Sequence, residues 1–353
     1  METKDLQSSS LLPFEFTGRF GEFFRIWIVN LVLTILTLGI YSAWAKVRTQ
    51  RYFYANTRLA GATFDYLAEP MMILKGRLIA VGFFILYLGL TLIAPPFDLL
   101  ASLLFLIAMP WIVNKALAFR AHNSAYRNIR FGFEQNYSKA IKVFIGLPIL
   151  LPLSLGLLYP FFDQRRSRFI LGQSRYGASA FAMEAPLGRF YKTYLLAGLL
   201  LLGVFFLGGV LSSRLFESVM TMSAQPAGEP PVAMRGSLLG LLPILVGSLL
   251  VYGFIKARIA NLIWNHTDLN GHRFESYMQA RKLIVLLLTN ALAIILSLGL
   301  LIPWAKIRMA RYRAETLQFI PQEDLDGFLA DQAEQVAATG EGVGDVFDVD
   351  LGL

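Results

Sequence analysis

The stretch Asn30–Tyr52, NLVLTILTLGIYSAWAKVRTQRY, recurs near the other end of the chain as Asn290–Tyr312, NALAIILSLGLLIPWAKIRMARY. Eleven of the 23 positions are identical without a gap, which chance similarity between apolar segments does not explain. A third copy follows the first at an offset of 117 residues, where Leu155-Gly156 matches Leu38-Gly39. Self-similarity of this kind is typical of a chain that repeats one supersecondary unit.

Two weaker copies complete a set of five, with Trp111 and Lys115 in one and Phe254 and Arg258 in the other at the matching aromatic and basic positions. A polar stretch with a turn signal follows each of the first four copies, which predicts a β-hairpin after each helix. Phe14–Phe16 resembles the second strand of one more such hairpin, and the copies group into three pseudo-repeats. The hairpins are expected at residues 57–66, 124–133, 174–183 and 267–276.

Long apolar runs place the chain in a membrane, since 56% of its residues are hydrophobic and only 16% are charged. A helix needs about 20 apolar residues to cross a bilayer core. We expect four runs to span, at residues 78–93, 99–119, 194–211 and 237–254. Three further runs, at residues 26–45, 143–162 and 283–305, have basic residues on both sides and contain Ser/Thr-Leu-Gly.

Glycine breaks helices easily, so these three runs are expected to form re-entrant helical hairpins that enter and leave on the same side. Seven plain transmembrane helices are the alternative. The sequence thus predicts an all-α polytopic membrane protein with internal pseudo-repeats and short cytoplasmic β-hairpins.

The distribution of charge predicts the orientation and the domains. Lysine and arginine gather in the segments expected to be cytoplasmic under the positive-inside rule, and none follows Arg313. We expect residues 1–23 to be a cytoplasmic segment with a short strand and residues 24–320 to be a membrane domain built from the repeats. Residues 321–353 are expected to form an acidic, mostly disordered cytoplasmic tail.

A family resemblance rests on these motifs. The opening FEFTGRFGEFF, the LGIYSAWAKVR core and the NTRLAGATF stretch that follows are similar to the YjgN family of bacterial inner-membrane proteins, over roughly residues 11–320. The resemblance implies an inner-membrane location. Because that family is classed as a domain of unknown function, the resemblance implies no mechanism and no catalytic residue.

In the three full copies an aromatic residue and two basic residues recur at i, i+4 and i+7, which is one face of a helix. One interpretation is an interfacial anchor, with the ring at headgroup depth and the cations beyond it. The other is a site for an anion, either a lipid phosphate or a solute, because the arginine fork binds paired oxygens. These arginine stripes are Trp44, Arg48 and Arg51, then Phe161, Arg165 and Arg168, then Trp304, Arg308 and Arg311.

Two asparagines lie inside apolar runs, where polar groups are costly and often functional. Asn30 and Asn290 are candidates to line a polar path in the membrane, or they hydrogen-bond a neighbouring helix. His266 and His272 flank a predicted turn and are expected to be solvated, and the three histidines of the chain are too scattered for a metal site.

No phosphate-binding glycine loop, zinc-protease motif or nucleophile elbow occurs, so we expect neither an enzyme nor a cofactor. The basic residues flank apolar runs and form no basic domain, which argues against nucleic acid as a partner. The expected partner is the bilayer, with anionic lipids, and the sequence does not fix the oligomeric state. Two functions stay open: transport or a channel for a small or anionic solute, and a membrane scaffold or lipid-organising protein.

Overall fold

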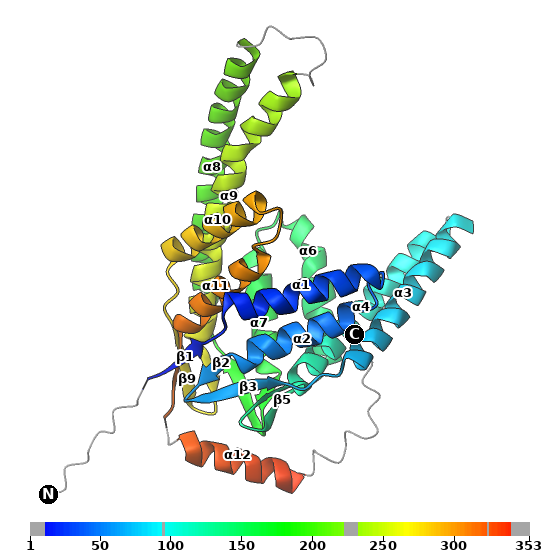
Figure 1. The fold of residues 1–353 in the computed structure, drawn as a ribbon, viewed down its shortest axis with the longest axis vertical. Coiled ribbons are helices and arrows are strands. Elements are labelled where there is room, and N and C mark those ends of the chain that lie inside the picture. The colour runs from blue at the N-terminus through cyan, green and yellow to red at the C-terminus, as the bar shows by residue number, and fades with distance from the viewer. Residues whose placement is uncertain (1–10, 94–95, 222–231, 323–324, 340–353) are drawn as a thin grey trace, which may run out of the picture. The chain divides into compact units, whose positions relative to one another are not determined.

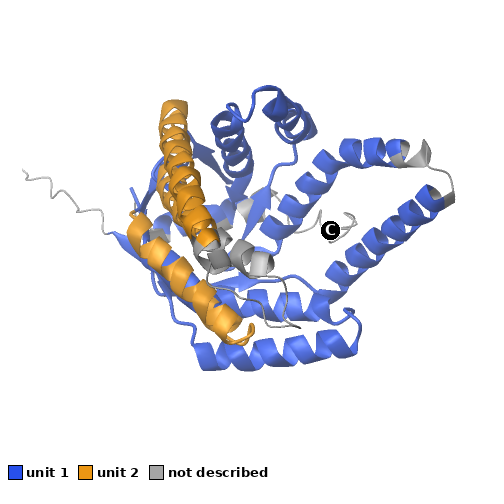
Figure 2. Cartoon of the chain, turned by 90° about the horizontal axis from the view of Figure 1, so that it is seen from above, with its two compact units in different colours: residues 1–185, 263–276, 306–353 blue, residues 186–262, 277–305 orange. Residues whose placement is uncertain are grey.

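The structure is a computed structural model that describes residues 11–93, 96–221, 232–322 and 325–339 (Figure 1). The chain divides into two compact units, shown in Figure 2. The first unit holds residues 1–185, 263–276 and 306–353, and the second holds residues 186–262 and 277–305. The predicted N-terminal segment and tail lie partly outside the described residues.

Ten short strands form one closed antiparallel barrel in the first unit. The strands follow chain order around the barrel from β2 to β10, and β1 lies between β10 and β2. Closure pairs the strand edges, which removes a surface prone to aggregation. The strands are β1 (Leu12–Phe16), β2 (Thr57–Leu59), β3 (Ala62–Tyr66), β4 (Ser124–Tyr126), β5 (Ile129–Phe133), β6 (Ser174–Tyr176), β7 (Ser179–Met183), β8 (Thr267–Leu269), β9 (His272–Ser276) and β10 (Leu317–Ile320).

The predicted all-α fold class is wrong, because the hairpins join into this barrel. All four predicted hairpins are present within the expected bounds. The sequence pattern did not reveal that the long strand of each hairpin pairs with the short strand of the next, as Phe64 pairs with Tyr126 and Phe131 with Tyr176. Backbone groups make these bonds, so a local side-chain pattern carries little information about which strand is the partner.

The two ends of the repeat array complete the barrel together. Leu12 in β1 lies opposite Phe319 in β10, which reproduces the pairing of Ala62 with Leu59 in the first hairpin. On its other side β1 pairs with β2, where Phe14 lies opposite Leu59. Strand β1 is therefore the second strand of a fifth hairpin whose first strand is β10.

In each copy, two helical segments come before the short strand. In every copy after the first, these segments follow the long strand of the copy before. Their order therefore repeats five times along the chain. The first and second copies contain α1 (Phe20–Leu36) with α2 (Ser42–Ala55), and α3 (Pro70–Ile93) with α4 (Pro96–His122). The third contains α5 (Tyr137–Ile141), a π-helical turn (Lys142–Gly146) and α6 (Leu147–Leu153), followed by α7 (Tyr159–Gly172). The fourth and fifth contain α8 (Leu187–Thr221) with α9 (Val232–Trp264), and α10 (Ala280–Leu296) with α11 (Ile302–Glu315).

The three runs with Ser/Thr-Leu-Gly are each interrupted at that motif. Leu38 and Gly39 have φ of 50° and 94°, and the other two Leu-Gly pairs adopt the same left-handed turn. The Thr37 hydroxyl donates to the Leu33 carbonyl at 2.7 Å and accepts the Tyr41 N–H at 2.9 Å. This hydroxyl thereby satisfies backbone groups that the break would otherwise leave unpaired.

Within the described part of the chain, four helices are long and apolar enough to cross a membrane. They belong to α3, α4, α8 and α9, which contain the four runs expected to span. The candidate spans are Pro70–Gly89, Ala101–His122, Leu187–Arg214 and Pro243–Trp264.

Side chains fill the inside of the barrel. One core cluster gathers Tyr126, Tyr176 and Phe319 from short strands with Phe131 and Phe274 from long strands. The rings of Phe131 and Tyr176 lie 5.0 Å apart, and those of Phe274 and Phe319 lie 5.3 Å apart. The barrel is therefore a packed core.

Helix α12 (Leu325–Thr339) packs against this core (Figure 1). Its Phe328 ring lies 4.4 Å from the ring of His272, which is 2% exposed, so the expectation of a solvated His272 is wrong. The side-chain amide oxygen of Gln332 (Oε1) accepts the N–H groups of Ala178 and Ser179 at 3.0 and 3.1 Å. A helix within the predicted acidic tail is thus attached to the turn between β6 and β7.

Candidate functional site

Each copy buries the same position of its first helix and the same position of its second helix. The buried first-helix residues are 0–4% exposed: Phe23, Ile73, Ala140, Phe190 and Leu283. The buried second-helix residues are 0–7% exposed: Val47, Asn114, Gln164, Ala257 and Ile307. The arginine stripes lie on second helices, so the packing around the buried position fixes which way each stripe faces.

The second arginine of the stripe holds the backbone in two copies. Arg51 donates from Nε to the Tyr66 carbonyl at 3.3 Å and from Nη2 to the Ala68 carbonyl at 3.1 Å. Arg311 donates to the carbonyl of Gly18 at 3.3 Å. Ala68 and Gly18 occupy the same place, two residues after the long strand. We call this contact the strand clamp.

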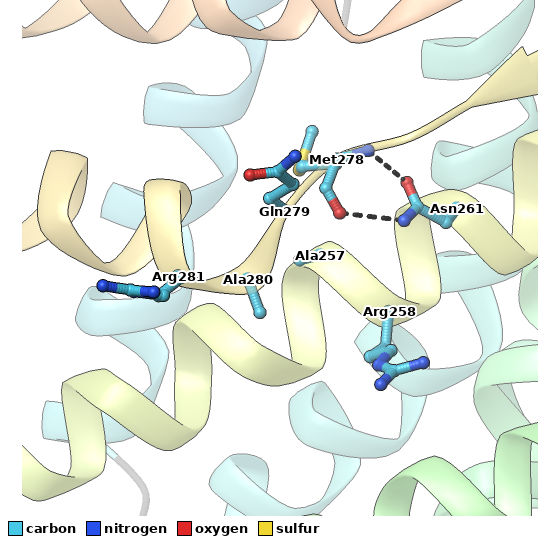
Figure 3. Close-up of a pocket in the computed structure, with 7 residues that line it drawn as sticks. All are labelled: Ala257, Arg258, Asn261, Met278, Gln279, Ala280 and Arg281. Atoms are coloured by element: carbon cyan, nitrogen blue, oxygen red, sulfur yellow. Dashed lines mark hydrogen bonds between the residues drawn. The ribbon is translucent and has the colours of Figure 1, made fainter.

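An asparagine makes the same clamp in the fourth copy, and in the third copy Gln164, at the buried second-helix position, donates to the carbonyl of Ala185 at 3.1 Å. Asn261 occupies the position of Arg51 in the fourth copy and bonds Met278 twice, at 2.9 Å to its carbonyl and 2.8 Å from its N–H (Figure 3). In the second copy Asn114, also at the buried second-helix position, accepts the N–H of Asn136, three residues after the long strand, at 3.3 Å. Arg168 in the third copy lies 4.0 Å from the exposed carboxylate of Glu184. Asn261 is not among the candidate residues predicted from the sequence, although the repeat alignment places it at the clamp position.

Replacing Arg51 by lysine tests the clamp. Lysine keeps the charge but cannot present two N–H groups to two carbonyls in a fixed fork. We expect Arg51→Lys to lower the free energy of unfolding by about 1 kcal/mol, the net value of a typical hydrogen bond. The midpoint of unfolding in detergent measures this change. Arg48→Lys is the matched control, and an equal loss in both variants would contradict a clamp at Arg51.

The first basic residue of the stripe makes contacts that differ from those of the second arginine. Arg48 donates to the Tyr41 hydroxyl at 2.9 Å, and the guanidinium of Arg165 lies 5.0 Å from the centre of the Phe161 ring. Among the described residues, neither has a carboxylate within 4.0 Å. The repeat alignment puts a basic residue at this position in all five copies: Arg48, Lys115, Arg165, Arg258 and Arg308.

Both candidate asparagines link the two helices of their own hairpin. The Asn30 amide donates to the Ala45 carbonyl at 3.4 Å, and the Asn290 amide donates to the Ala305 carbonyl at 3.4 Å. They are 5% and 6% exposed. This geometry matches the helix-to-helix hydrogen bond proposed as one of their two roles.

A pocket of about 380 Å³ lies within the second unit. Its lining includes the Asn261 clamp, Arg258 and Arg281, and none of the residues predicted to line a solute path. Figure 3 shows the side chains of Arg258 and Arg281 extending in different directions, so they do not converge on one ligand. Within the described residues, no group of three or more His, Cys, Asp or Glu is placed to hold a metal ion.

The model of a family of bacterial proteins of unknown function, DUF898, matches residues 11–346 of the chain. The chain belongs to this family. An inner membrane protein YjgN of Salmonella typhimurium strain LT2 is 25% identical to it over 369 residues, which cover 92% of this chain and 91% of that relative. The inner membrane protein YjgN of Escherichia coli K12 is 31% identical over 147 residues, which cover 41% of this chain and 37% of that relative.

No solved structure matches the chain. The resemblance drawn from the repeated motifs is confirmed, and this member of the DUF898 family is a membrane protein with several helices that could span.

Proposed function

We propose that the chain is a non-catalytic scaffold of the inner membrane that gathers anionic lipids through the first basic residue of the stripe. The observation that carries the proposal is the recurrence of a basic side chain at this position in all five copies. The second arginine varies between copies and serves the strand clamp, so the two positions of the stripe have different roles.

The placement of the first basic residue along its hairpin supports a headgroup contact. The end of α1 and the turn that follows it, both before Trp44, carry exposed apolar side chains. Leu36 is 73% exposed and Leu38 is 96% exposed. Such exposure suits contact with lipid tails, and a tryptophan ring prefers the interface between tails and headgroups. Arg48 lies one turn from Trp44 on the side toward β2, where we expect the lipid phosphates to lie.

The packed barrel favours a scaffold over the alternative of transport. Transport needs a polar route through the protein, and the aromatic core occupies the barrel interior. Asn30 and Asn290 are engaged inside their own hairpins. Under the positive-inside rule, the proposed orientation puts the basic segments and the acidic tail in the cytoplasm.

Lipid binding by purified protein tests the proposal. The variant that replaces Arg48, Arg165 and Arg308 with glutamine is expected to retain about tenfold less phosphatidylglycerol than the wild type, because charge-assisted contacts are lost. Native mass spectrometry of protein in detergent with equal amounts of phosphatidylglycerol and phosphatidylethanolamine measures the retention.

The matched control replaces Arg58, Arg130 and Arg273, three exposed arginines on barrel strands of the same unit, with glutamine. It removes the same charge and should retain phosphatidylglycerol like the wild type. Equal loss in both variants would mean that net charge alone, without a defined position, attracts the lipid.

A further inference from the structure

Three basic side chains from three helices are directed to the junction between the first and second copies. They are Lys46 on α2, Arg77 on α3 and Arg120 on α4, and the charges of both arginines act on Lys46. Arg77 donates from Nη1 to the hydroxyl of Ser42. Ser42 lies one helical turn before Lys46 on the same face of α2, so this bond brings Arg77 beside Lys46.

A second contact fixes α4 against α2. The hydroxyl groups of Tyr54 on α2 and Ser124 are 2.9 Å apart. The Ser124 hydroxyl also donates to the carbonyl of Arg120 at 2.8 Å, which ties this contact to the last turns of α4. These contacts bring the segments that carry the three cations together, and the charges of Arg77 and Arg120 lie close enough to act on Lys46.

The described residues supply no counter-charge to this cluster. None of the three cations has a carboxylate within 4.0 Å among them. Burial, followed by the positive charges of Arg77 and Arg120, lowers the pKa of Lys46. Like charges held together destabilise a protein unless an anion lies between them. The junction thus has the electrostatics of an anion site.

Comparison of the copies shows that this cluster is not a general feature of the repeat. Lys306 occupies the position of Lys46 in the fifth copy, but Trp27 and Phe53 stand at the positions aligned with Arg77 and Arg120. Lys256 occupies it in the fourth copy, where Leu287 and Arg313 stand at those positions, so one of the three cations is missing there. The three cations together are specific to one junction.

The cluster also includes two arginines near the barrel-side ends of candidate membrane spans, where we expect phosphate groups of the bilayer. Arg77 and Arg120 belong to candidate spans, each within a few turns of the barrel strand that adjoins its helix. Trp44 on α2 packs on the apolar cluster of the same junction. Two guanidinium groups and one ammonium group suit the three terminal oxygens of a phosphate.

We propose that Lys46, Arg77 and Arg120 form a binding site for one phosphate group, carried by a lipid headgroup or by a free phosphate compound. This site differs from the repeated position of Arg48, and it does not depend on the proposed function.

Binding to full-length protein in detergent tests the site with two probes, inorganic phosphate and phosphatidic acid. Lys46→Gln and Arg120→Gln are expected to weaken binding about tenfold each, the effect of losing one charge-assisted contact. Lys306→Gln is the matched control and should bind like the wild type. Lys46→Gln without added anion should melt no lower than the wild type, because it relieves repulsion.

The two probes separate the sources of the phosphate. If inorganic phosphate binds and the binding depends on Lys46, the site accepts a free phosphate compound. Binding of phosphatidic acid alone, with the same dependence, assigns the site to a lipid headgroup. Equal binding of both probes by wild type and Lys46→Gln, or an equal loss in Lys306→Gln, would overturn the proposal.

Discussion

Deletion of residues 2–17 is expected to abolish accumulation of the folded protein. The deletion removes β1, which pairs with β10 on one side and β2 on the other, and so opens the barrel at two edges. It also removes Phe16, which packs on Phe23 and Ile307 in a buried cluster. Loss of one large core side chain costs about 3–5 kcal/mol, and a whole domain is stable by about 5–15 kcal/mol.

A strand transplant should restore the fold, because β1 and β10 form a hairpin split between the ends of the repeat array. In the rescue chain, residues 2–17 are deleted and Phe319 is followed by an Asn-Gly turn and then residues 12–18. The same turn, Asn270-Gly271, joins β8 and β9 in the fourth hairpin. Fluorescence-detected size-exclusion chromatography of detergent extracts measures the amount of monodisperse protein.

The control carries residues 12–18 in scrambled order after the same turn and is expected to fail. A deleted chain that accumulates and elutes like the full-length protein would show that the barrel does not need β1. Failure of the transplant with success of the scrambled control would contradict the assignment of β1 to the fifth hairpin.

Phe23→Ala is expected to lower the free energy of unfolding by about 3–5 kcal/mol, the usual range for a buried phenylalanine. The Phe23 side chain is 0% exposed, and its ring lies 4.8 Å from Phe53 and 5.3 Å from Tyr52. Removing the ring leaves a cavity between α1 and α2, and the closely packed side chains around it cannot easily shift to fill it. Unfolding by sodium dodecyl sulfate, followed by tryptophan fluorescence, measures the loss.

Phe20→Ala is the matched control on the same helix, one turn earlier, where the ring is 36% exposed. The expected loss of unfolding free energy is far smaller for Phe20→Ala, because folding buries less of the Phe20 ring. Phe190→Ala changes the equivalent position of the fourth copy, which is also 0% exposed, and should cost as much as Phe23→Ala. Similar small losses at Phe20 and Phe23 would contradict the buried position that the repeats share.

The candidate site could be predicted from the sequence only in part. The spacing of Trp44, Arg48 and Arg51 placed the three side chains on one helix face, because helix geometry is local. The spacing could not show that Arg51 is engaged with the carbonyls of Tyr66 and Ala68, since those groups come from another element. Nor could it show that Arg120 lies near Lys46, because α3 and α4 must pack first.

The sequence by itself determined the repeats, the breaks at Leu-Gly, the bounds of the four hairpins and the four helices that could span. Turn residues and apolar run lengths specify these features over a few residues, so they can be recognised before any packing is known. The tertiary structure alone decided that ten strands close into a barrel, where Leu12 meets Phe319. Closure depends on backbone hydrogen bonds between strands that are distant in the chain, and every residue type except proline offers the same donor and acceptor for them.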